Sequence, residues 1–214
     1  MVESTSRIRR PVGGFLLELL GRMVPKRFLL ILLLAGCSTI GGQTPSNIED
    51  ACSIVRQKPA WNRAMKNTER TWGIPVSVQM AIIYQESKFE AKARPPRKYF
   101  LGFIPTGHVT SAYGYGQAID GTWKWYKDDA GRFGARRDNF ADASDFIGWY
   151  SDISAKQLGL SKRDTQNLYL AYHEGHAGYK RGSYRSKAWL MEVARSVDRV
   201  ERRYRSQLRG CNVA

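Results

Sequence analysis

The sequence predicts a single, mainly α-helical domain with at most one small β-hairpin. Apolar residues recur at helical spacing in most segments between residues 59 and 209. Residues 51–214 contain no further linker and no internal repeat, and their number suits one domain with a substantial core. Only residues 92–110 break the pattern strongly, with three prolines and two glycines around a short apolar run.

The first two helices are predicted at residues 59–72 and 75–87. Apolar side chains recur at helical spacing through the first of them, and Gly73 supplies a stop. Pro75 suits the first turn of the second helix, because its backbone angle φ is already fixed near the helical value. Val78, Ile82 and Glu86 then lie on one face of this helix, four residues apart.

The remaining elements are predicted from residue 92 onward. Residues 92–110 are expected to form a loop or a small irregular β-hairpin, where a helical domain could place a lobe or a lid. Asp138 and Ser161 are candidate helix caps, since their side-chain oxygens can accept hydrogen bonds from free backbone N–H groups. Four further helices are expected, at residues 119–127, 138–158, 163–172 and 186–209.

The N-terminal part of the chain has the pattern of an export signal. Lys26 and Arg27 precede a short apolar run that ends at Leu34, which predicts a signal peptide over residues 23–36. The run is far shorter than the roughly 18 residues that span a bilayer as a helix. Residues 1–22 are unlike a signal-peptide start, which leaves two alternatives: Met1 is the start, or Met23 is the start and residues 1–22 are an upstream extension.

The segment Leu34-Ala35-Gly36-Cys37 resembles the lipobox of bacterial lipoproteins. The resemblance implies that Cys37 becomes the lipidated first residue and anchors the protein in a membrane. Ser38 resembles the sorting residue of outer-membrane lipoproteins, which implies the periplasmic face of the outer membrane. Residues 37–50 are small and polar and are expected to form a flexible tether. The alternative is a buried strand that happens to precede a cysteine.

The charge balance points to an anionic polymer as partner. The chain has 34 basic and 19 acidic side chains, and 28 and 17 remain after removal of residues 1–36, a net charge of +11. Such a charge suits nucleic acid or a carboxylate-rich cell wall. Export favours peptidoglycan, the wall polymer, as the partner, because an exported protein rarely meets nucleic acid. A nucleic-acid binder remains the alternative if the signal peptide is spurious.

With Cys37 lipidated, Cys52 and Cys211 are the two cysteines left in the exported chain. In an oxidising compartment they form one natural pair, so the sequence predicts a disulfide that closes a loop of about 160 residues. Two unpaired thiols are the alternative.

Glu86 is the candidate catalytic residue. It follows an almost wholly apolar stretch near the end of its predicted helix and shares a face with Ile82 and Val78. Burial in apolar surroundings raises the pKa of a carboxyl group, because desolvation disfavours the charged form. The negative end of the helix dipole acts in the same direction. Most glutamates in such positions are nevertheless solvated, so the wider setting decides.

Two later segments supply that setting. In residues 111–123, Gly114 and Gly116 flank a tyrosine directly before Gln117. Glycine allows close approach of the backbone to a ligand, and a glutamine amide can bond both donors and acceptors on a sugar. Residues 170–179 hold Tyr172, His173, Glu174 and His176 at a predicted helix end.

Together, the three segments resemble the signature of the lysozyme-like lytic transglycosylases, the soluble lytic transglycosylase domain family. That signature is Glu-Ser after an apolar helix, then Gly-Ala-x-Gly-Leu-Met-Gln, then Ala-Tyr-Asn-Ala-Gly. The resemblance covers residues 60–205 and is carried by eight positions: Glu86, Ser87, Ala112, Gly114, Gln117, Ala171, Tyr172 and Gly175.

The resemblance implies a lysozyme-like fold and a peptidoglycan substrate. Glu86 would be the single acid, Ser87 and Gln117 would orient the acid or the substrate, and Tyr172 would line the cleft beside the Glu86 carboxyl. Further substrate-binding positions are expected at Tyr113, His173 and Glu174. One glutamate acting first as acid and then as base would cut the glycan and leave a 1,6-anhydro end. No cofactor is expected, and the enzyme is expected to be a monomer.

The departures from the signature leave alternatives open. Ser111, the pair Tyr115 and Gly116, and the pair His173 and Glu174 replace family residues, which puts the sugar preference in doubt. If Glu174 faced the cleft as a base, a hydrolytic muramidase would result, since hydrolases of this kind use two carboxylates. A wall-binding lipoprotein without activity is the other alternative. Two neighbouring histidines without an H-E-x-x-H motif do not predict a metal.

Overall fold

The structure is a computed structural model that describes residues 43–211. The expected upstream extension, signal peptide and lipidated Cys37 lie outside the described residues. The described residues form a compact unit with its own apolar core. Within the described part, no helix is long and apolar enough to cross a membrane.

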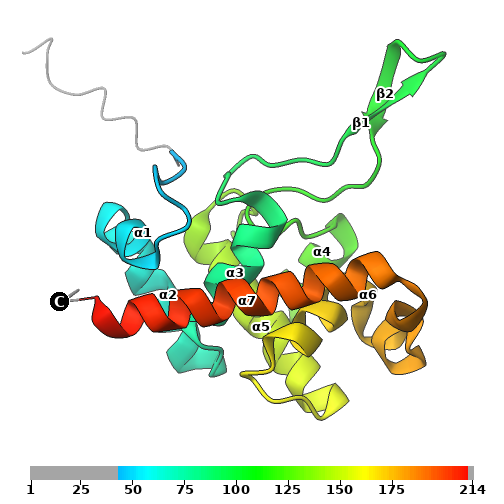
Figure 1. Cartoon of the computed structure of the whole chain (residues 1–214). Coiled ribbons are helices and arrows are strands. Elements are labelled where there is room, and N and C mark those ends of the chain that lie inside the picture. The colour runs from blue at the N-terminus through cyan, green and yellow to red at the C-terminus, as the bar shows by residue number, and fades with distance from the viewer. Residues whose placement is uncertain (1–42, 212–214) are drawn as a thin grey trace, which may run out of the picture. The chain divides into compact units, whose positions relative to one another are not determined.

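The domain is mainly helical with one small sheet, as the sequence predicts (Figure 1). The α-helices and strands of the described residues are, in order, α1 (Ala51–Gln57), α2 (Pro59–Trp72), α3 (Val76–Ser87), β1 (Arg97–Phe100), β2 (Ile104–His108), α4 (Asp120–Asp129), α5 (Phe140–Leu158), α6 (Thr165–Arg181) and α7 (Ala188–Gly210). A short 3₁₀ turn over Ser183–Ser186 joins α6 to α7.

Helix α3 is the centre of the domain, and it carries Glu86 near its end. It packs against α2, α5 and α7, and most of its residues are buried. A helix that is apolar on most sides is stable only when neighbours cover it. Its one fully buried amide, Gln79, donates to the carbonyl oxygens of Met65 and Ile74 and accepts from the Ser144 hydroxyl at 2.7 Å. These bonds fix α3 against α2 and α5.

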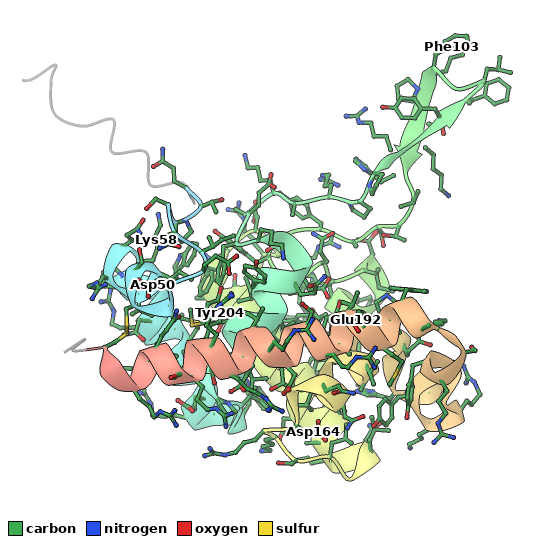
Figure 2. The ribbon with its side chains drawn as sticks, in the orientation of Figure 1. Asp50, Lys58, Phe103, Asp164, Glu192 and Tyr204 are labelled. Carbon is green, nitrogen blue, oxygen red and sulfur yellow. A yellow bond between two sulfur atoms is a disulfide. The ribbon has the colours of Figure 1, made fainter. Side chains whose placement is uncertain are left out.

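The predicted hairpin is present as strands β1 and β2, which pair antiparallel with a bulge between Lys98 and Tyr99. Figure 1 shows it extending from the helical body, and Figure 2 labels Phe103 at its tip. Its side chains are exposed apart from the half-buried His108. The hairpin therefore contributes little to the core.

Several element boundaries differ from the sequence prediction. Asn139, not Asp138, caps α5 by accepting from two backbone N–H groups, and Asp164, not Ser161, caps α6. Helix α6 continues to Arg181, well beyond residue 172. It does so through a kink at Gly175, whose φ of 71° is available to glycine with little strain. Helix α1 was not expected.

The segment expected to be a flexible tether differs as well. From residue 44 onward it lies against the domain, with Pro45 buried and Ile48 packed on the core. The Tyr204 hydroxyl donates to the Ile48 carbonyl oxygen, and the Ala51 N–H donates to the Gln207 side chain at 2.8 Å. Small polar residues suggested a linker, but their backbone groups find partners on α7. The tether prediction for residues 37–42 lies outside the described part.

The predicted disulfide between Cys52 and Cys211 is confirmed, with 5.6 Å between the two Cα atoms. It joins the first turn of α1 to the end of α7. The two ends of the described domain are thereby held together.

Candidate active site

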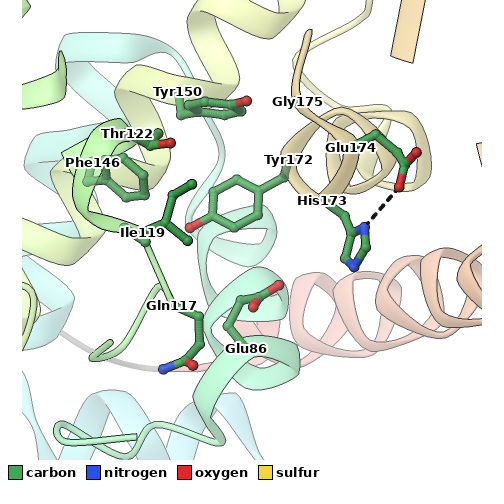
Figure 3. Close-up of a pocket in the computed structure, with 11 residues that line it drawn as sticks. Glu86, Gln117, Ile119, Thr122, Phe146, Tyr150, Tyr172, His173, Glu174 and Gly175 are labelled. Carbon is green, nitrogen blue, oxygen red and sulfur yellow. Dashed lines mark hydrogen bonds and ion pairs between the residues drawn. The ribbon is translucent and has the colours of Figure 1, made fainter. Parts of the chain in front are cut away.

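A cavity of about 310 Å³ opens where α3, α5 and α6 meet the segment before α4 (Figure 3). It brings together one residue from each of the three sequence segments: Glu86, Gln117 and Tyr172. Its other lining residues are Ala118, Ile119, Thr122, Phe146, Tyr150, His173, Glu174 and Gly175. The cavity is therefore a mixture of aromatic walls and a few polar groups, as is usual for ligand sites.

Glu86 lies in the last turn of α3, and its carboxyl group is largely removed from water. Burial raises the pKa of this group to about 7, while the Tyr169 hydroxyl and the positive charge of Lys88 oppose the rise. A carboxyl group with this pKa is present in both protonated and ionised forms near neutral pH. It can therefore give a proton and take one back.

Two tyrosines of α6 stand beside this carboxyl group. Tyr169 and Tyr172 are three residues apart and so share one face of the helix. Burial and the nearby Glu86 raise the pKa of both phenols, which keeps them protonated. The Tyr172 hydroxyl donates to the Gly116 carbonyl oxygen, which ties α6 to the second motif. Tyr169 was missed in the sequence, although its spacing from Tyr172 was a usable signal.

The Gln117 side chain is fixed by its own amide group. Its Nε2 donates to the carbonyl oxygens of Ala93 at 2.9 Å and Gly114 at 2.8 Å. Because both partners are acceptors, the orientation of the amide is determined, and Oε1 remains as an acceptor at the cavity. Figure 3 shows this side chain beside Glu86. Gln117 can thus accept a hydrogen bond from a sugar N–H or hydroxyl group.

The two glycines of the second motif pack closely against other parts of the protein. Gly114 has φ of 80°, and a Cβ atom there would lie 2.1 Å from the Arg137 carbonyl oxygen. At Gly116 a Cβ atom would lie 3.0 Å from the Tyr172 hydroxyl oxygen. Close approach of a ligand to these glycines stays a prediction, and neither glycine is among the residues that line the cavity. The two glycines let the loop pack against the segment at Arg137 and against α6.

Glu174 lines the cavity, but its carboxyl group is engaged elsewhere. Lys187 Nζ lies 2.7 and 2.9 Å from its two oxygens, and the Ser183 hydroxyl and the His173 ring also bond to it. The hydrogen bonds from Lys187 and Ser183 lower the pKa of Glu174 to about 2. In Figure 3 the carboxyl group points away from Glu86. It joins the kinked part of α6 to the start of α7.

The other predicted substrate residues are placed differently. The Ser87 hydroxyl donates back to the Ile83 carbonyl oxygen at 3.2 Å, and Ser87 does not line the cavity. The Arg94 guanidinium carbon lies over the Tyr113 ring, 4.3 Å from the ring centre, and Tyr113 is also outside the cavity lining. His173 does line the cavity, and its ring packs edge-on against the exposed Trp189 at 5.3 Å.

His176, the other histidine of the third segment, packs into the protein. Its ring stacks on Tyr150 at 4.5 Å, and its Nε2 lies 2.9 Å from the Ser154 hydroxyl oxygen. Over residues 43–211, no three His, Cys, Asp or Glu side chains are grouped so that they could hold a metal ion.

A central buried helix that ends in a protonatable glutamate, together with a small hairpin and an aromatic cavity, is the arrangement of a lysozyme-like domain. Residues 26–211 match the family model described as the Transglycosylase SLT domain. The chain belongs to this family, and membership supports lytic transglycosylase activity on peptidoglycan. No curated protein matches the chain.

Proposed function

We propose that this domain cleaves the β-1,4 bond between N-acetylmuramic acid and N-acetylglucosamine in peptidoglycan, leaving 1,6-anhydro-muramic acid ends. The observation that carries the proposal is the Glu86 carboxyl group, whose pKa of about 7 suits both halves of such a reaction. Glu86 acts as the catalytic acid and then as the catalytic base.

In the first half, the protonated Glu86 carboxyl gives its proton to the glycosidic oxygen, and the bond from that oxygen to the muramic acid C1 breaks. N-acetylglucosamine leaves with a new 4-hydroxyl group. In the second half, ionised Glu86 removes the proton from the 6-hydroxyl group of the same muramic acid. The freed oxygen forms a bond to C1 and closes the anhydro ring. No water is consumed, and Glu86 ends protonated as it began.

The state of the second carboxyl group supports this scheme over hydrolysis. A hydrolytic muramidase ordinarily uses a second carboxylate as base or nucleophile. Glu174 is the other acidic residue of the cavity lining, and Lys187 and Ser183 occupy its oxygens. A carboxylate with a pKa of about 2 is also a weak base. We therefore assign Glu174 to holding α6 against α7.

The neighbouring groups suit substrate positioning. Gln117 Oε1 accepts from the sugar, and the Tyr169 phenol borders the Glu86 carboxyl group as a donor. Tyr172 lines the cavity beside them, with its own hydroxyl donating to the Gly116 carbonyl oxygen. Exposed Trp189 packs against His173 of the cavity lining and offers a ring face on which a sugar can stack. Ser87 and Tyr113 do not line the cavity, so we assign them indirect roles, through α3 and through the loop before Gln117, in place of the substrate contacts expected from the sequence.

The direct test compares two glutamate variants on purified peptidoglycan. Glu86→Gln keeps the size of the side chain but cannot release a proton, so turnover should fall by at least about a thousandfold. Glu90→Gln, at an exposed position in the same segment, should keep wild-type turnover. Both variants should still sediment with peptidoglycan. Equal lysis by the wild type and Glu86→Gln would remove Glu86 as the catalytic acid. Binding of the wild type to peptidoglycan without any lysis would remove the proposal and favour a wall-binding protein without activity.

We also propose that the protein is a monomeric lipoprotein, anchored through Cys37 at the periplasmic face of the outer membrane. The disulfide of the described domain supports an oxidising compartment. Labelled palmitate should enter the wild type and not Cys37→Ser, and density fractionation should place the wild type with outer membranes. An unlabelled wild type in the cytosol would contradict the anchor. Light scattering of the domain tests the monomer.

A further inference from the structure

The tip of the β1–β2 hairpin exposes a cluster of large apolar side chains. Phe103 is 71 % exposed, Leu101 69 % and Phe100 60 %, and Tyr99 and Ile104 beside them are also exposed. Soluble proteins scatter such residues singly on their surface, whereas a contiguous cluster marks an interaction site. These five residues, 99–104 without Gly102, are called the apolar tip below.

The base of the hairpin is basic, and it is called the stem below: Lys92 in the segment that leads to β1, and Arg97 and Lys98 on β1 itself. Lys92, Arg97 and Lys98 are exposed, and no acidic residue occurs between Glu90 and Asp120. Among the described residues, these three cations have no carboxylate within ion-pair distance. Their charges are therefore available to an external anionic partner.

The apolar tip and the basic stem lie at different distances from the helical body. Strand β1 has four residues, so about 13 Å of extended chain separates Arg97 from the turn at Leu101 and Gly102. Figure 2 shows Phe103 at the far end of the hairpin, away from the helices. In a membrane surface the phosphate groups lie outside the acyl chains. A hairpin that enters tip first would therefore bring its apolar tip to the acyl chains and its basic stem to the phosphates.

We propose that the apolar tip inserts into the surface of an anionic phospholipid bilayer, with Lys92, Arg97 and Lys98 bound to the lipid phosphates. Leu101 and Ile104 offer a sugar no hydrogen bonds, which argues against glycan as the partner of the tip. A second copy of this strongly basic chain would bring like charges together at the stem. The contact is separate from Glu86 and does not depend on catalysis.

The test is co-sedimentation of the domain from residue 42 onward with lipid vesicles. This unit carries its own core and disulfide, and it lacks Cys37, so an acyl anchor cannot contribute. Vesicles containing phosphatidylglycerol should bind it, and vesicles of phosphatidylcholine alone should bind it more weakly. Raising the salt concentration should weaken binding, because it screens the contacts of the stem.

Matched variants distinguish binding through the apolar tip from non-specific binding through other exposed apolar side chains. Phe100→Ser with Phe103→Ser should lower the partition coefficient by about a hundredfold, roughly tenfold for each aromatic side chain. Phe133→Ser is the control, because Phe133 is 75 % exposed but lies outside the hairpin. Arg97→Glu with Lys98→Glu should abolish the preference for anionic vesicles, whereas Arg56→Glu with Arg63→Glu should leave most of it.

Insertion itself has a spectroscopic signature. A polarity-sensitive dye on Phe103→Cys should shift to the blue when vesicles are added, and the same dye on Phe133→Cys should not. Folding of each variant is checked by circular dichroism and by activity on peptidoglycan, which should match the wild type.

Three results would overturn the proposal. One is failure of the wild-type domain to bind anionic vesicles. Another is equal loss of vesicle binding in Phe133→Ser and in the double tip variant. The third is a wild-type dimer that the double tip variant dissociates, which would assign the tip to a second copy. Failure of the proposed glycan cleavage would leave the vesicle result unaffected.

Discussion

Glu86 and Glu174 line the same cavity, but their carboxyl groups lie in opposite environments. Burial without a cationic hydrogen-bond partner raises the pKa of Glu86 to about 7, whereas Lys187 and Ser183 lower the pKa of Glu174 to about 2. Two acids whose environments separate their pKa values in this way have different roles. The first can transfer protons near neutral pH, and the second holds two helices together.

The raised pKa of Glu86 predicts that this residue weakens folding at alkaline pH. Its folded pKa of about 7 exceeds the ordinary value of 4.5, so its favourable contribution is complete below pH 4.5 and disappears as the pH rises through 7. Glu86→Gln should therefore be more stable than the wild type at pH 8, by up to about 3 kcal/mol. Near pH 4 the two should be equal. Chemical unfolding at a series of pH values measures the free energy of unfolding of both proteins. A difference between them that does not change with pH would contradict the raised pKa of Glu86.

The lowered pKa of Glu174 predicts the opposite pH dependence. Its contribution is present above its ordinary pKa of 4.5 and is lost as the pH falls towards 2. Glu174→Gln should be less stable at pH 7 by up to about 3 kcal/mol, with the loss shrinking in acid. Glu192→Gln is the control: it removes a carboxylate that is 57 % exposed and screened by water, so its effect on stability should be much smaller.

Glu174→Gln also tests whether Glu174 takes part in the reaction. Because its oxygens are bound by Lys187 and Ser183, Glu174→Gln should change the amount of product through stability and not the kind of product. Unchanged stability together with lost turnover would mark Glu174 as a reacting group.

Gly114 should tolerate no side chain. Gly114→Ala would require a left-handed backbone and would place Cβ 2.1 Å from the Arg137 carbonyl oxygen. We expect a loss of more than about 2 kcal/mol of stability and reduced turnover, because the Gly114 carbonyl also positions Gln117. Gly121→Ala is the control, since its Cβ meets no atom within 4 Å. Melting curves of the two variants should differ clearly, and similar curves would contradict this account.

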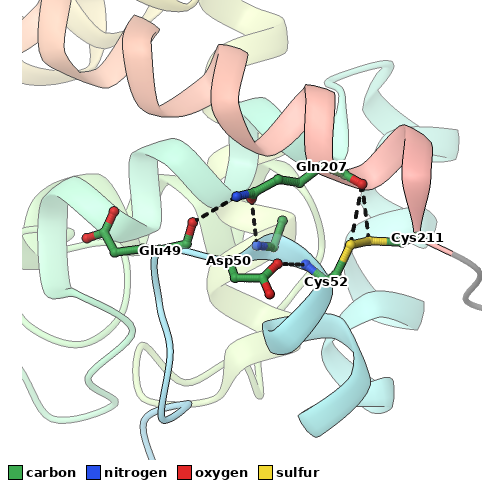
Figure 4. Close-up of a disulfide and its surroundings, with 6 residues drawn as sticks. Glu49, Asp50, Cys52, Gln207 and Cys211 are labelled. Carbon is green, nitrogen blue, oxygen red and sulfur yellow. Dashed lines mark hydrogen bonds between the residues drawn. A yellow bond between two sulfur atoms is a disulfide. The ribbon is translucent and has the colours of Figure 1, made fainter.

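The disulfide should matter for stability and not for catalysis. Cys52→Ser with Cys211→Ser opens a loop with a sequence separation of 159 residues, which costs up to about 5 kcal/mol in the chain-entropy model. Gln207 bridges the same ends through the backbone of Glu49 and Ala51 (Figure 4), so the native arrangement should persist at low temperature. The variant should melt earlier but retain turnover when folded. Lost turnover in a folded variant would contradict this expectation.

Much of the fold could be predicted because its signals are local. Apolar spacing located α2 and α3, and the prolines and glycines of residues 92–110 indicated the hairpin. Caps and boundaries were less certain, since neighbouring residues such as Asp138 and Asn139 compete for the same N–H groups. The packing of residues 44–50 depends on Tyr204 and Gln207, more than 150 positions away, which no local pattern reveals.

The candidate site was predicted in part. Glu86, Gln117 and Tyr172 meet at one cavity, as expected from the order of their motifs. The orientation of a side chain depends on tertiary partners, so the sequence could not show that Lys187 turns Glu174 away or that Ser87 bonds back to its own helix. The purpose of the glycines was likewise hidden, because their close neighbours are Arg137 and Tyr172.

The chemical identity of the cut glycan ends tests the central claim most directly. Wild-type protein is incubated with purified peptidoglycan, and the soluble fragments are analysed by mass spectrometry before and after borohydride reduction. A single acid and base at Glu86 predicts fragments that are one water lighter than hydrolysis products and resist reduction. Fragments with reducible muramic acid ends would contradict the account and select a hydrolytic mechanism.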